Sequence, residues 1–179
     1  MALLIIIEDE ELLAESIQLA VGEALPHWHT KLYSTLGAVD LGLAKQDNIC
    51  VLMEPGLRDV SREDSVRQVA EAFPDALIYV LSSRMFEGEE ETYLRQGAKR
   101  FFNIVDADVF TLLRILAEEY EEKFGSPLPA LGKREEQVYR LSIDGLSIRE
   151  IAAQLKMAEQ TVKNTRNRIH RKGYVTKPF

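Results

Sequence analysis

The stretch from Gly145 to Gly173, GLSIREIAAQLKMAEQTVKNTRNRIHRKG, has the pattern of two short helices joined by a tight turn. Ser147 and Glu150 have the S-x-x-E spacing of a capping box, which predicts the start of the first helix. The apolar residues that follow recur at helical spacing: Ile148, Ile151, Ala152 and Leu155. After the turn, Val162 and Ile169 lie on one helical face and predict the buried side of the second helix.

The second of these helices is basic on the side that is left for solvent. Its cations are Lys163, Arg166, Arg168, Arg171 and Lys172. Two short helices at a steep angle, the second of them basic, form a helix-turn-helix whose second helix reads the DNA major groove. The alternative is a solvated basic helix in an ordinary helical bundle. We favour the first interpretation because the cations gather on the predicted recognition helix.

Charge is divided unequally along the 179 residues. Residues 127–179 contain eleven Lys and Arg against five Asp and Glu, a net charge of +6, while the preceding residues carry −13. The overall charge of −7 therefore conceals a basic module, and it predicts two domains with different partners.

Composition narrows the class of protein. The single cysteine excludes an intramolecular disulfide and favours a reducing compartment. No apolar run approaches the roughly 20 residues that span a bilayer, and the N-terminus lacks the basic start of a signal peptide. We expect a cytoplasmic protein with no membrane partner.

The first 124 residues alternate between short apolar runs and helical patterns. The predicted strands are Leu3–Ile7, His29–Tyr33, Ile49–Met53, Ala76–Leu81 and Arg100–Ile104. The predicted helices are Glu10–Ala24, Leu36–Ala44, Val66–Phe73, Glu87–Gln96 and Val109–Phe124. This alternation predicts an α/β fold with a doubly wound parallel sheet over 1–124. A linker over 125–132 and a small all-α helix-turn-helix domain over 133–179 follow.

Polar residues follow the ends of the predicted strands. Glu8 and Asp9 follow the first strand, and Glu54 follows the third. Since the carboxyl ends of parallel strands meet at one edge, these three carboxylates are candidates for a divalent-cation site. The alternative is that they are solvated or cap the next helix.

At this point the whole chain resembles a response regulator of the NarL/FixJ type, a receiver domain followed by a LuxR-type helix-turn-helix. The resemblance is most specific from Glu136 to Asn164, and it is moderately specific in IIIEDEELL and in Gly97–Phe102, GAKRFF. It implies a (βα)5 receiver-like fold and a DNA-binding function without enzymatic activity.

The resemblance also assigns roles to residues at the sheet edge. Glu8 and Asp9 match the acidic pair that holds magnesium, and Glu54 falls where the phosphoryl-accepting aspartate belongs. Ser82 matches the switch hydroxyl, Phe101 the switch aromatic, and Ile104 the lysine that ends the fifth strand.

At two of these positions, the residue present lacks the chemistry that phosphoryl transfer needs. Glu54 places its carboxylate one methylene further out than the aspartate nucleophile, and Ile104 cannot pair with a phosphoryl group. We therefore expect a pseudoreceiver that is not switched by ordinary phosphorylation. Glu54 is either a fixed partial mimic of the phosphorylated state or has no signalling role in a docking or dimerisation scaffold.

With no lysine nearby, the sequence leaves Glu8, Asp9 and Glu54 without an evident counter-charge. Either a cation binds there, or one carboxylate has a raised pKa, or a distant arginine such as Arg84 folds in. We expect no cofactor, with magnesium at these three carboxylates as the weaker alternative.

LuxR-type domains continue past the recognition helix into a fourth helix that pairs two copies. Here the chain ends with Tyr174–Phe179, and Pro178 does not fit inside a helix. We therefore expect the fourth helix to be absent and any homodimer to form through the receiver-like domain. The face would include Glu87–Gln96 or Val109–Phe124, although most apolar residues of the latter are expected to pack in the core.

For DNA reading, the resemblance places Lys163, Asn164 and Asn167 on the groove side, where lysine suits guanine and asparagine suits adenine. Further candidate contacts with bases or backbone are Arg166 and Arg168, and with phosphate Thr161, Arg171 and Lys172. Ala158 precedes the recognition helix at a position where a serine cap is usual. The missing cap lowers helix stability by about 1 kcal/mol, which Gln160 or Glu159 could offset.

The leading hypothesis is a DNA-binding transcriptional regulator, an orphan response regulator independent of phosphorylation, with double-stranded promoter DNA as its partner. The alternative is a protein-interaction module whose acidic domain docks RNA polymerase or a signalling protein, with only weak DNA binding.

Overall fold

The computed structural model describes residues 2–84, 86–106 and 108–174, and the chain divides into two compact units, Met1–Pro127 and Leu128–Phe179. The first unit contains one five-stranded sheet in the order β2-β1-β3-β4-β5, and every pair of neighbouring strands is parallel. The strands are β1 Leu3–Ile7, β2 His29–Tyr33, β3 Ile49–Met53, β4 Leu77–Ser82 and β5 Arg100–Asn103. The predicted doubly wound fold is confirmed.

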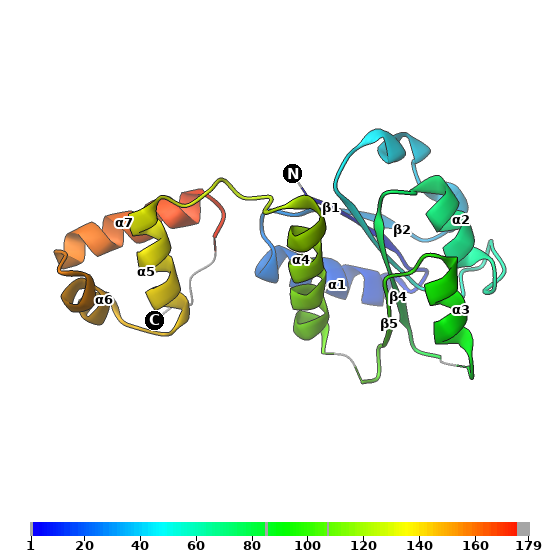
Figure 1. The fold of residues 1–179 in the computed structure, drawn as a ribbon. Coiled ribbons are helices and arrows are strands. Elements are labelled where there is room, and N and C mark those ends of the chain that lie inside the picture. The colour runs from blue at the N-terminus through cyan, green and yellow to red at the C-terminus, as the bar shows by residue number, and fades with distance from the viewer. Residues whose placement is uncertain (1, 85, 107, 175–179) are drawn as a thin grey trace. The chain divides into compact units, whose positions relative to one another are not determined.

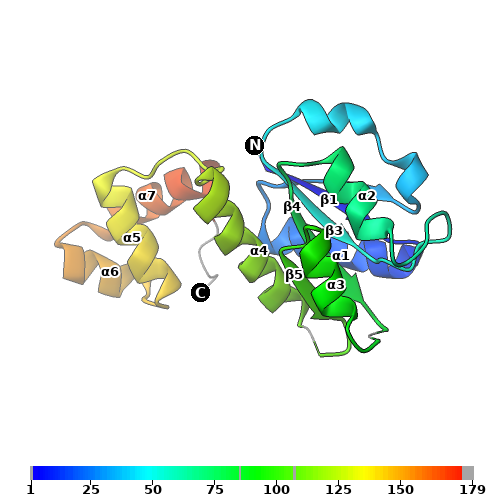
Figure 2. The same cartoon turned by 45° about the vertical axis from the view of Figure 1, so that its right-hand side comes forward.

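Four α-helices cover the two faces of this sheet (Figures 1 and 2). They are α1 Glu11–Ala24, α2 Ser65–Ala72, α3 Glu89–Gln96 and α4 Val109–Phe124. Helices α1 and α4 pack on the face that carries Leu4 and Leu52, and α2 and α3 pack on the face that carries Ile5 and Val51. The central strands β1, β3 and β4 are buried on both faces, which is why they read as continuous apolar runs.

The segment predicted as a helix over Leu36–Ala44 is instead two 3₁₀ turns, Leu36–Ala38 and Leu41–Lys45. The first turn is held from outside, since the Asp59 carboxylate accepts hydrogen bonds from the backbone N–H groups of Leu36 and Gly37. The second begins at Asp40, whose side chain accepts from the N–H of Gly42. Two glycines, the local bond to Asp40 and the two bonds to the distant Asp59 favour short turns over a continuous α-helix.

Helix α4 is anchored to the sheet by its apolar face and by one buried carboxylate. Its residues Leu112, Leu113, Leu116 and Tyr120 are buried in the core, as the alternative for this helix predicted. Glu119 is buried beside them and accepts hydrogen bonds from the Tyr79 hydroxyl at 2.9 Å and from Arg100 Nε at 2.6 Å. The buried negative charge of Glu119 is thereby compensated by a cation and a hydrogen bond.

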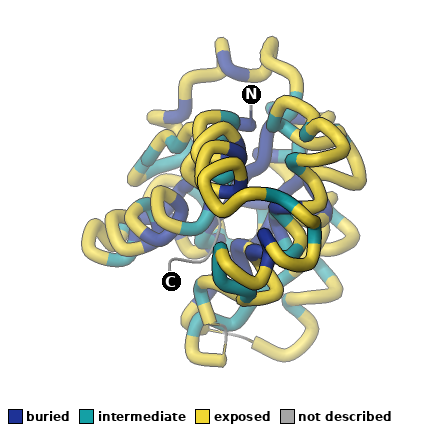
Figure 3. Tube along the Cα trace, turned by 90° about the vertical axis from the view of Figure 1, so that its left-hand side faces the viewer, coloured by how far each residue is buried: buried dark blue, intermediate teal, exposed yellow. Residues whose placement is uncertain are grey.

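The second unit is a three-helix domain of α5 Lys133–Ile143, α6 Ile148–Leu155 and α7 Glu159–Arg171. Its core is small and consists of Val138, Ile151, Ala152, Val162 and Ile169. Buried and exposed residues alternate along its helices, as the burial colouring of Figure 3 shows. The predicted absence of a fourth helix concerns residues 175–179, which lie outside the described residues.

Within residues 2–84, 86–106 and 108–174, no helix has the length and apolar character needed to cross a membrane.

Candidate nucleic-acid interface and acidic pocket

Local hydrogen bonds fix the start of α6 as the sequence predicted. Ser147 is the N-cap and its hydroxyl accepts from the N–H of Glu150, while the Glu150 carboxylate accepts from the N–H of Ser147 at 2.8 Å. The helix ends at Lys156, which adopts the left-handed conformation with φ of 52°. This turn separates α6 from α7, so that the two helices form the predicted helix-turn-helix.

Helix α7 divides cleanly into a buried and an exposed face. Val162, Thr165 and Ile169 are buried against α5 and α6. The exposed candidate DNA contacts are Gln160, Thr161, Lys163, Asn164, Asn167, Arg168 and Arg171. Helical spacing places Gln160, Asn164, Asn167 and Arg171 on one side of α7.

A hollow of about 370 Å³ lies along this exposed face, lined by Thr161, Asn164, Asn167, Arg168 and Arg171. Side-chain donors on one side of an exposed helix suit the phosphates and base edges of a DNA groove. The N-cap residue Ala158 makes no side-chain capping bond, in agreement with the expectation for this position.

Three of the predicted contacts are engaged within the domain. The Lys172 ammonium donates to Glu135 Oε2 at 2.6 Å and to the backbone carbonyl of Ala130 at 3.0 Å. Arg168 Nε lies 3.9 Å from Glu135, and Arg166 is half-buried. Lys172 therefore ties the end of α7 to the start of α5, and its contact with phosphate stays a prediction.

Asn164 is oriented by a neighbour one helical turn earlier. Gln160 Nε2 donates to Asn164 Oδ1 at 3.1 Å. This bond engages the acceptor oxygen of the Asn164 amide and not its N–H donors. The predicted pairing of asparagine with adenine needs a donor and an acceptor, so Gln160 would have to release or share this oxygen on binding.

At the sheet of the first unit, strand register decides which carboxylates meet. Ile7 of β1 pairs with Met53 of β3, so the next residues, Glu8 and Glu54, leave the sheet side by side. Ser82 ends β4 and its hydroxyl lies 3.1 Å from Glu54 Oε1. A pocket of about 450 Å³ opens here, and the predicted residues that line it are Glu8, Asp9, Glu54 and Ile104.

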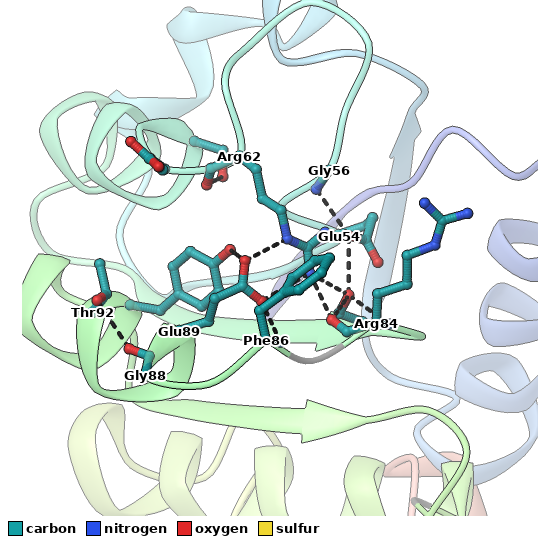
Figure 4. A network of polar contacts seen from close by, with 12 residues as sticks. Glu54, Gly56, Arg62, Arg84, Phe86, Gly88, Glu89 and Thr92 are labelled. Carbon is teal, nitrogen blue, oxygen red and sulfur yellow. Dashed lines mark hydrogen bonds and ion pairs between the residues drawn. The ribbon is translucent and has the colours of Figure 1, made fainter.

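The carboxylates of this pocket have counter-charges that the sequence analysis did not assign. Arg62 NH1 donates to Glu54 Oε1 at 2.9 Å, and Arg58 Nε donates to Asp9 Oδ2 at 2.9 Å. A distant arginine that folds in, such as Arg84, was one of the three alternatives, and the arginine that reaches Glu54 is Arg62. The Arg84 side chain is exposed and directed away from the network (Figure 4), and only the Arg84 backbone carbonyl accepts a bond from Arg62.

Glu8 has a different environment from Glu54. It is buried and hydrogen-bonded to the backbone N–H of Glu10 at 2.9 Å. Desolvation by burial, together with the negative charges of Glu54 and Asp9, raises the pKa of Glu8 from 4.5 to about 7, although the bond from Glu10 lowers it. A raised carboxylate pKa was one of the three alternatives, and it occurs together with the folded-in arginine.

Phe101, the predicted switch aromatic, points into the core on the α2 and α3 side of the sheet. It is partly buried and stacks on Tyr93 of α3, with ring centroids 6.1 Å apart and an angle of 12° between the rings. Among the described residues, no three acidic, histidine or cysteine side chains are grouped so as to hold a metal ion.

Comparisons with known proteins agree with this geometry. Residues 129–176 match the family model for bacterial regulatory proteins, luxR family. The second unit is a LuxR-type domain. The sequence matches none of the curated proteins.

Solved structures resemble the receiver-like domain and also the pair of domains. The RcsB response regulator of Salmonella typhimurium is similar at a TM-score of 0.58 with 17% identity, covering 99% of this chain and 95% of that one. RcsB of Salmonella enterica serovar Typhimurium, bound to promoter rprA in the presence of phosphomimetic BeF3−, is similar at a TM-score of 0.56 with 17% identity. The match covers 97% of this chain and 94% of that one. The beryllofluoride-activated NtrC4 receiver domain dimer is similar at a TM-score of 0.60 with 17% identity. The match covers 69% of this chain and 99% of that one. The first unit thus shares the fold of receiver domains, and the second unit matches the LuxR-type family model.

Sequence reasoning missed Arg58, Arg62 and Glu89 in the receiver-like domain and Glu135 in the LuxR-type domain. A signal for the first two was present, because they lie four and eight residues after Glu54 in the segment that leaves the acidic edge. Nothing in the sequence indicated Glu89, which reaches this site only through the packing of α3.

The raised pKa of Glu8 predicts how stability depends on pH. Between 4.5 and about 7 the folded protein binds more protons at Glu8 than the unfolded chain, so the free energy of unfolding falls as pH rises through this window. Glu8→Gln removes this fall. We expect the variant to unfold at a higher urea concentration than the wild type at about pH 8, with the difference closing towards about pH 5.

Glu15→Gln, at an exposed position of α1, is the control and should change the urea midpoint little at either pH. A Glu8→Gln variant whose stability relative to the wild type does not change with pH would contradict the assigned titration.

Proposed function

We propose that the chain is a DNA-binding transcriptional regulator, an orphan response regulator that reads promoter DNA with α7 and is not switched by phosphorylation. The observation that carries the DNA-binding part is the exposed face of α7. Lys163, Asn164, Asn167 and Arg171 lie there within a matched LuxR-type domain, opposite the buried Val162 and Ile169. A recognition helix needs this combination of base-reading and phosphate-binding side chains.

The structural neighbours support this use of the domain. One RcsB structure is described as bound to promoter rprA, and its two-domain chain corresponds to nearly the whole of this one. By analogy, we take double-stranded promoter DNA as the partner. The positive charge of the second unit suits a domain that reads DNA, and the negative charge of the first unit suits a separate control domain.

Independence from phosphorylation rests on the chemistry of the acidic pocket. Glu54 replaces the shorter nucleophile that phosphoryl transfer requires, and Ile104 offers no cation. The Glu54 oxygen nearest the switch hydroxyl also accepts from the Gly56 N–H at 2.8 Å and from Arg62. This oxygen, with its lone pairs engaged in this way, is a poor nucleophile for an incoming phosphodonor.

We infer a cytoplasmic, non-enzymatic protein that forms a homodimer through the receiver-like domain. Exposed apolar side chains that support such a contact are Leu12 and Leu19 on α1 and Phe110 at the start of α4. The NtrC4 neighbour is described as a receiver domain dimer, which agrees with this mode of assembly.

DNA reading can be separated into base and phosphate contacts by substitution. Using a site selected by the full chain from random duplexes, we expect Lys163→Ala and Asn164→Ala each to cost about 1–3 kcal/mol and relax the sequence preference. Arg171→Ala should weaken binding to specific and to random DNA similarly. It should also reduce the magnitude of the slope of log affinity against log salt concentration by about 1. Gel shifts at several salt concentrations measure both effects.

Lys133→Ala removes one exposed positive charge from α5 and is the matched control for charge. If Lys163→Ala binds its site with wild-type affinity and preference, the assignment of α7 as the recognition helix is wrong.

The second candidate function is a protein-interaction module with weak DNA binding, and the acidic receiver-like domain favours it. Competition between selected and random DNA at physiological salt distinguishes the two. A regulator retains a large ratio of specific to non-specific affinity, on the order of 10³ or more, whereas a docking module shows a ratio near one.

A small phosphodonor tests the pocket itself. After incubation with acetyl phosphate and magnesium, we expect the intact mass of the chain to stay unchanged, because Glu54 carries its carboxylate one methylene beyond the position of the aspartate nucleophile and Ile104 supplies no cation for the phosphoryl group. A mass increase of one phosphoryl group that Glu54→Gln abolishes would show instead that Glu54 is an acceptor.

A further inference from the structure

The guanidinium of Arg62 is the centre of the polar network in the receiver-like domain (Figure 4). It donates to Glu54 Oε1 at 2.9 Å, to Glu89 Oε1 at 2.7 Å, to the Ser82 hydroxyl at 3.0 Å and to the Arg84 carbonyl at 2.6 Å. The side chains of Arg62, Glu54 and Glu89 are 21%, 14% and 18% exposed, so these ion pairs are largely shielded from solvent.

These contacts join three segments that are far apart in the sequence. Glu54 follows β3, Ser82 ends β4, and Glu89 is the first residue of α3. Glu89 Oε2 also accepts from the N–H of Phe86, and the Phe86 ring lies over the Arg62 guanidinium at 5.5 Å. The start of α3 is therefore held to Arg62 by a salt bridge and a cation–π contact, and the Phe86 N–H bond fixes the preceding loop to Glu89.

The network continues to the predicted switch aromatic. The Tyr93 hydroxyl donates to Glu89 Oε1 at 3.1 Å, and the Tyr93 ring stacks on Phe101. Direct contacts thus run from Glu54 through Arg62, Glu89 and Tyr93 to Phe101. Such a chain gives the acceptor position a physical connection to α3 without any bound phosphoryl group or metal ion.

Arginine is suited to this position by its shape. Its planar guanidinium carries five N–H donors in a fixed fork, so one side chain can bind two carboxylates and two further oxygens at once. A lysine ammonium has three donors and no plane to stack on Phe86. Loss of Arg62 would leave two shielded carboxylates, Glu54 and Glu89, without their shared counter-charge.

We propose that Arg62 is a built-in clamp, an internal cation that fastens α3 to the acceptor position and keeps the switch region in one arrangement. The Arg62 clamp comprises Glu54, Arg62, Ser82 and Glu89. It explains how the receiver-like domain can hold α3 in place without a bound phosphoryl group. The proposal concerns this domain alone, and it stands or falls independently of DNA binding by α7.

Hydrogen exchange of the full chain, followed by mass spectrometry of peptides, tests the clamp. Arg62→Ala should increase the exchange rate of the α3 amides, residues 89–96, at least about tenfold, because local opening no longer breaks the ion pairs. Arg62→Lys should give a smaller increase, since it restores charge but not the fork. Amides of α1 and α4 on the opposite face should keep wild-type rates.

Arg58→Ala is the matched control. It removes an equal charge from the same acidic edge, but Arg58 binds Asp9 and its side chain is 78% exposed. We expect it to leave α3 exchange unchanged.

Two results would overturn the clamp. One is an Arg62→Ala variant whose α3 exchange equals that of Arg58→Ala. The other is an equal increase in exchange throughout residues 2–124, which would make Arg62 a general contributor to stability. Should Arg62→Ala fail to fold, Glu89→Gln provides the same test, since it removes the charge of the partner and keeps a neutral acceptor. Selective α3 opening in that variant supports the clamp, and wild-type α3 exchange refutes it.

Discussion

The ion pair of Arg62 with Glu54 and Glu89 is the constraint on which the acidic edge of the receiver-like domain depends. Parallel pairing of β1 and β3 forces Glu8 and Glu54 to emerge together, and without a cation their repulsion would oppose the register that buries both strands. The structure meets this problem with an internal arginine at Glu54 and a raised pKa at Glu8. Burial alone would lower the pKa of Arg62, but its bond to Glu89 and the surrounding negative charges raise it, so the cation stays charged.

The LuxR-type domain depends on a comparable local pairing. Glu135 accepts a hydrogen bond from the backbone N–H of Gly132 at the start of α5 and receives the Lys172 ammonium from the end of α7. These bonds lower the pKa of Glu135, and the bond from Lys172 has the largest effect. One carboxylate thus connects the first and last helices of a domain with a small apolar core. Lys172 therefore makes a structural contact within this domain, besides the contact with phosphate that the sequence predicts for it.

Much of the fold was predictable because its signals are local. The apolar runs of β1 and β3 have the predicted bounds, and the capping box at Ser147 forms as expected. The failures come from contacts between distant residues. Asp59 holds the first 3₁₀ turn of a segment predicted as a helix although it lies 22 or 23 positions away, and Arg62 reaches Glu89 across 27 positions. Periodicity reports which face of an element is buried, but it does not report which long side chain will cross to a neighbouring element.

We propose that the fixed pocket and the basic α7 belong to a regulator whose DNA reader operates without the usual phosphoryl switch. The most direct measurement is the affinity of the full chain for its selected DNA site, by fluorescence anisotropy, with and without beryllofluoride and magnesium. The account predicts the same dissociation constant in both conditions, because neither Glu54 nor Ile104 can hold the phosphoryl analogue and Arg62 already holds α3. A dissociation constant that changes tenfold or more, about 1.4 kcal/mol, would contradict it.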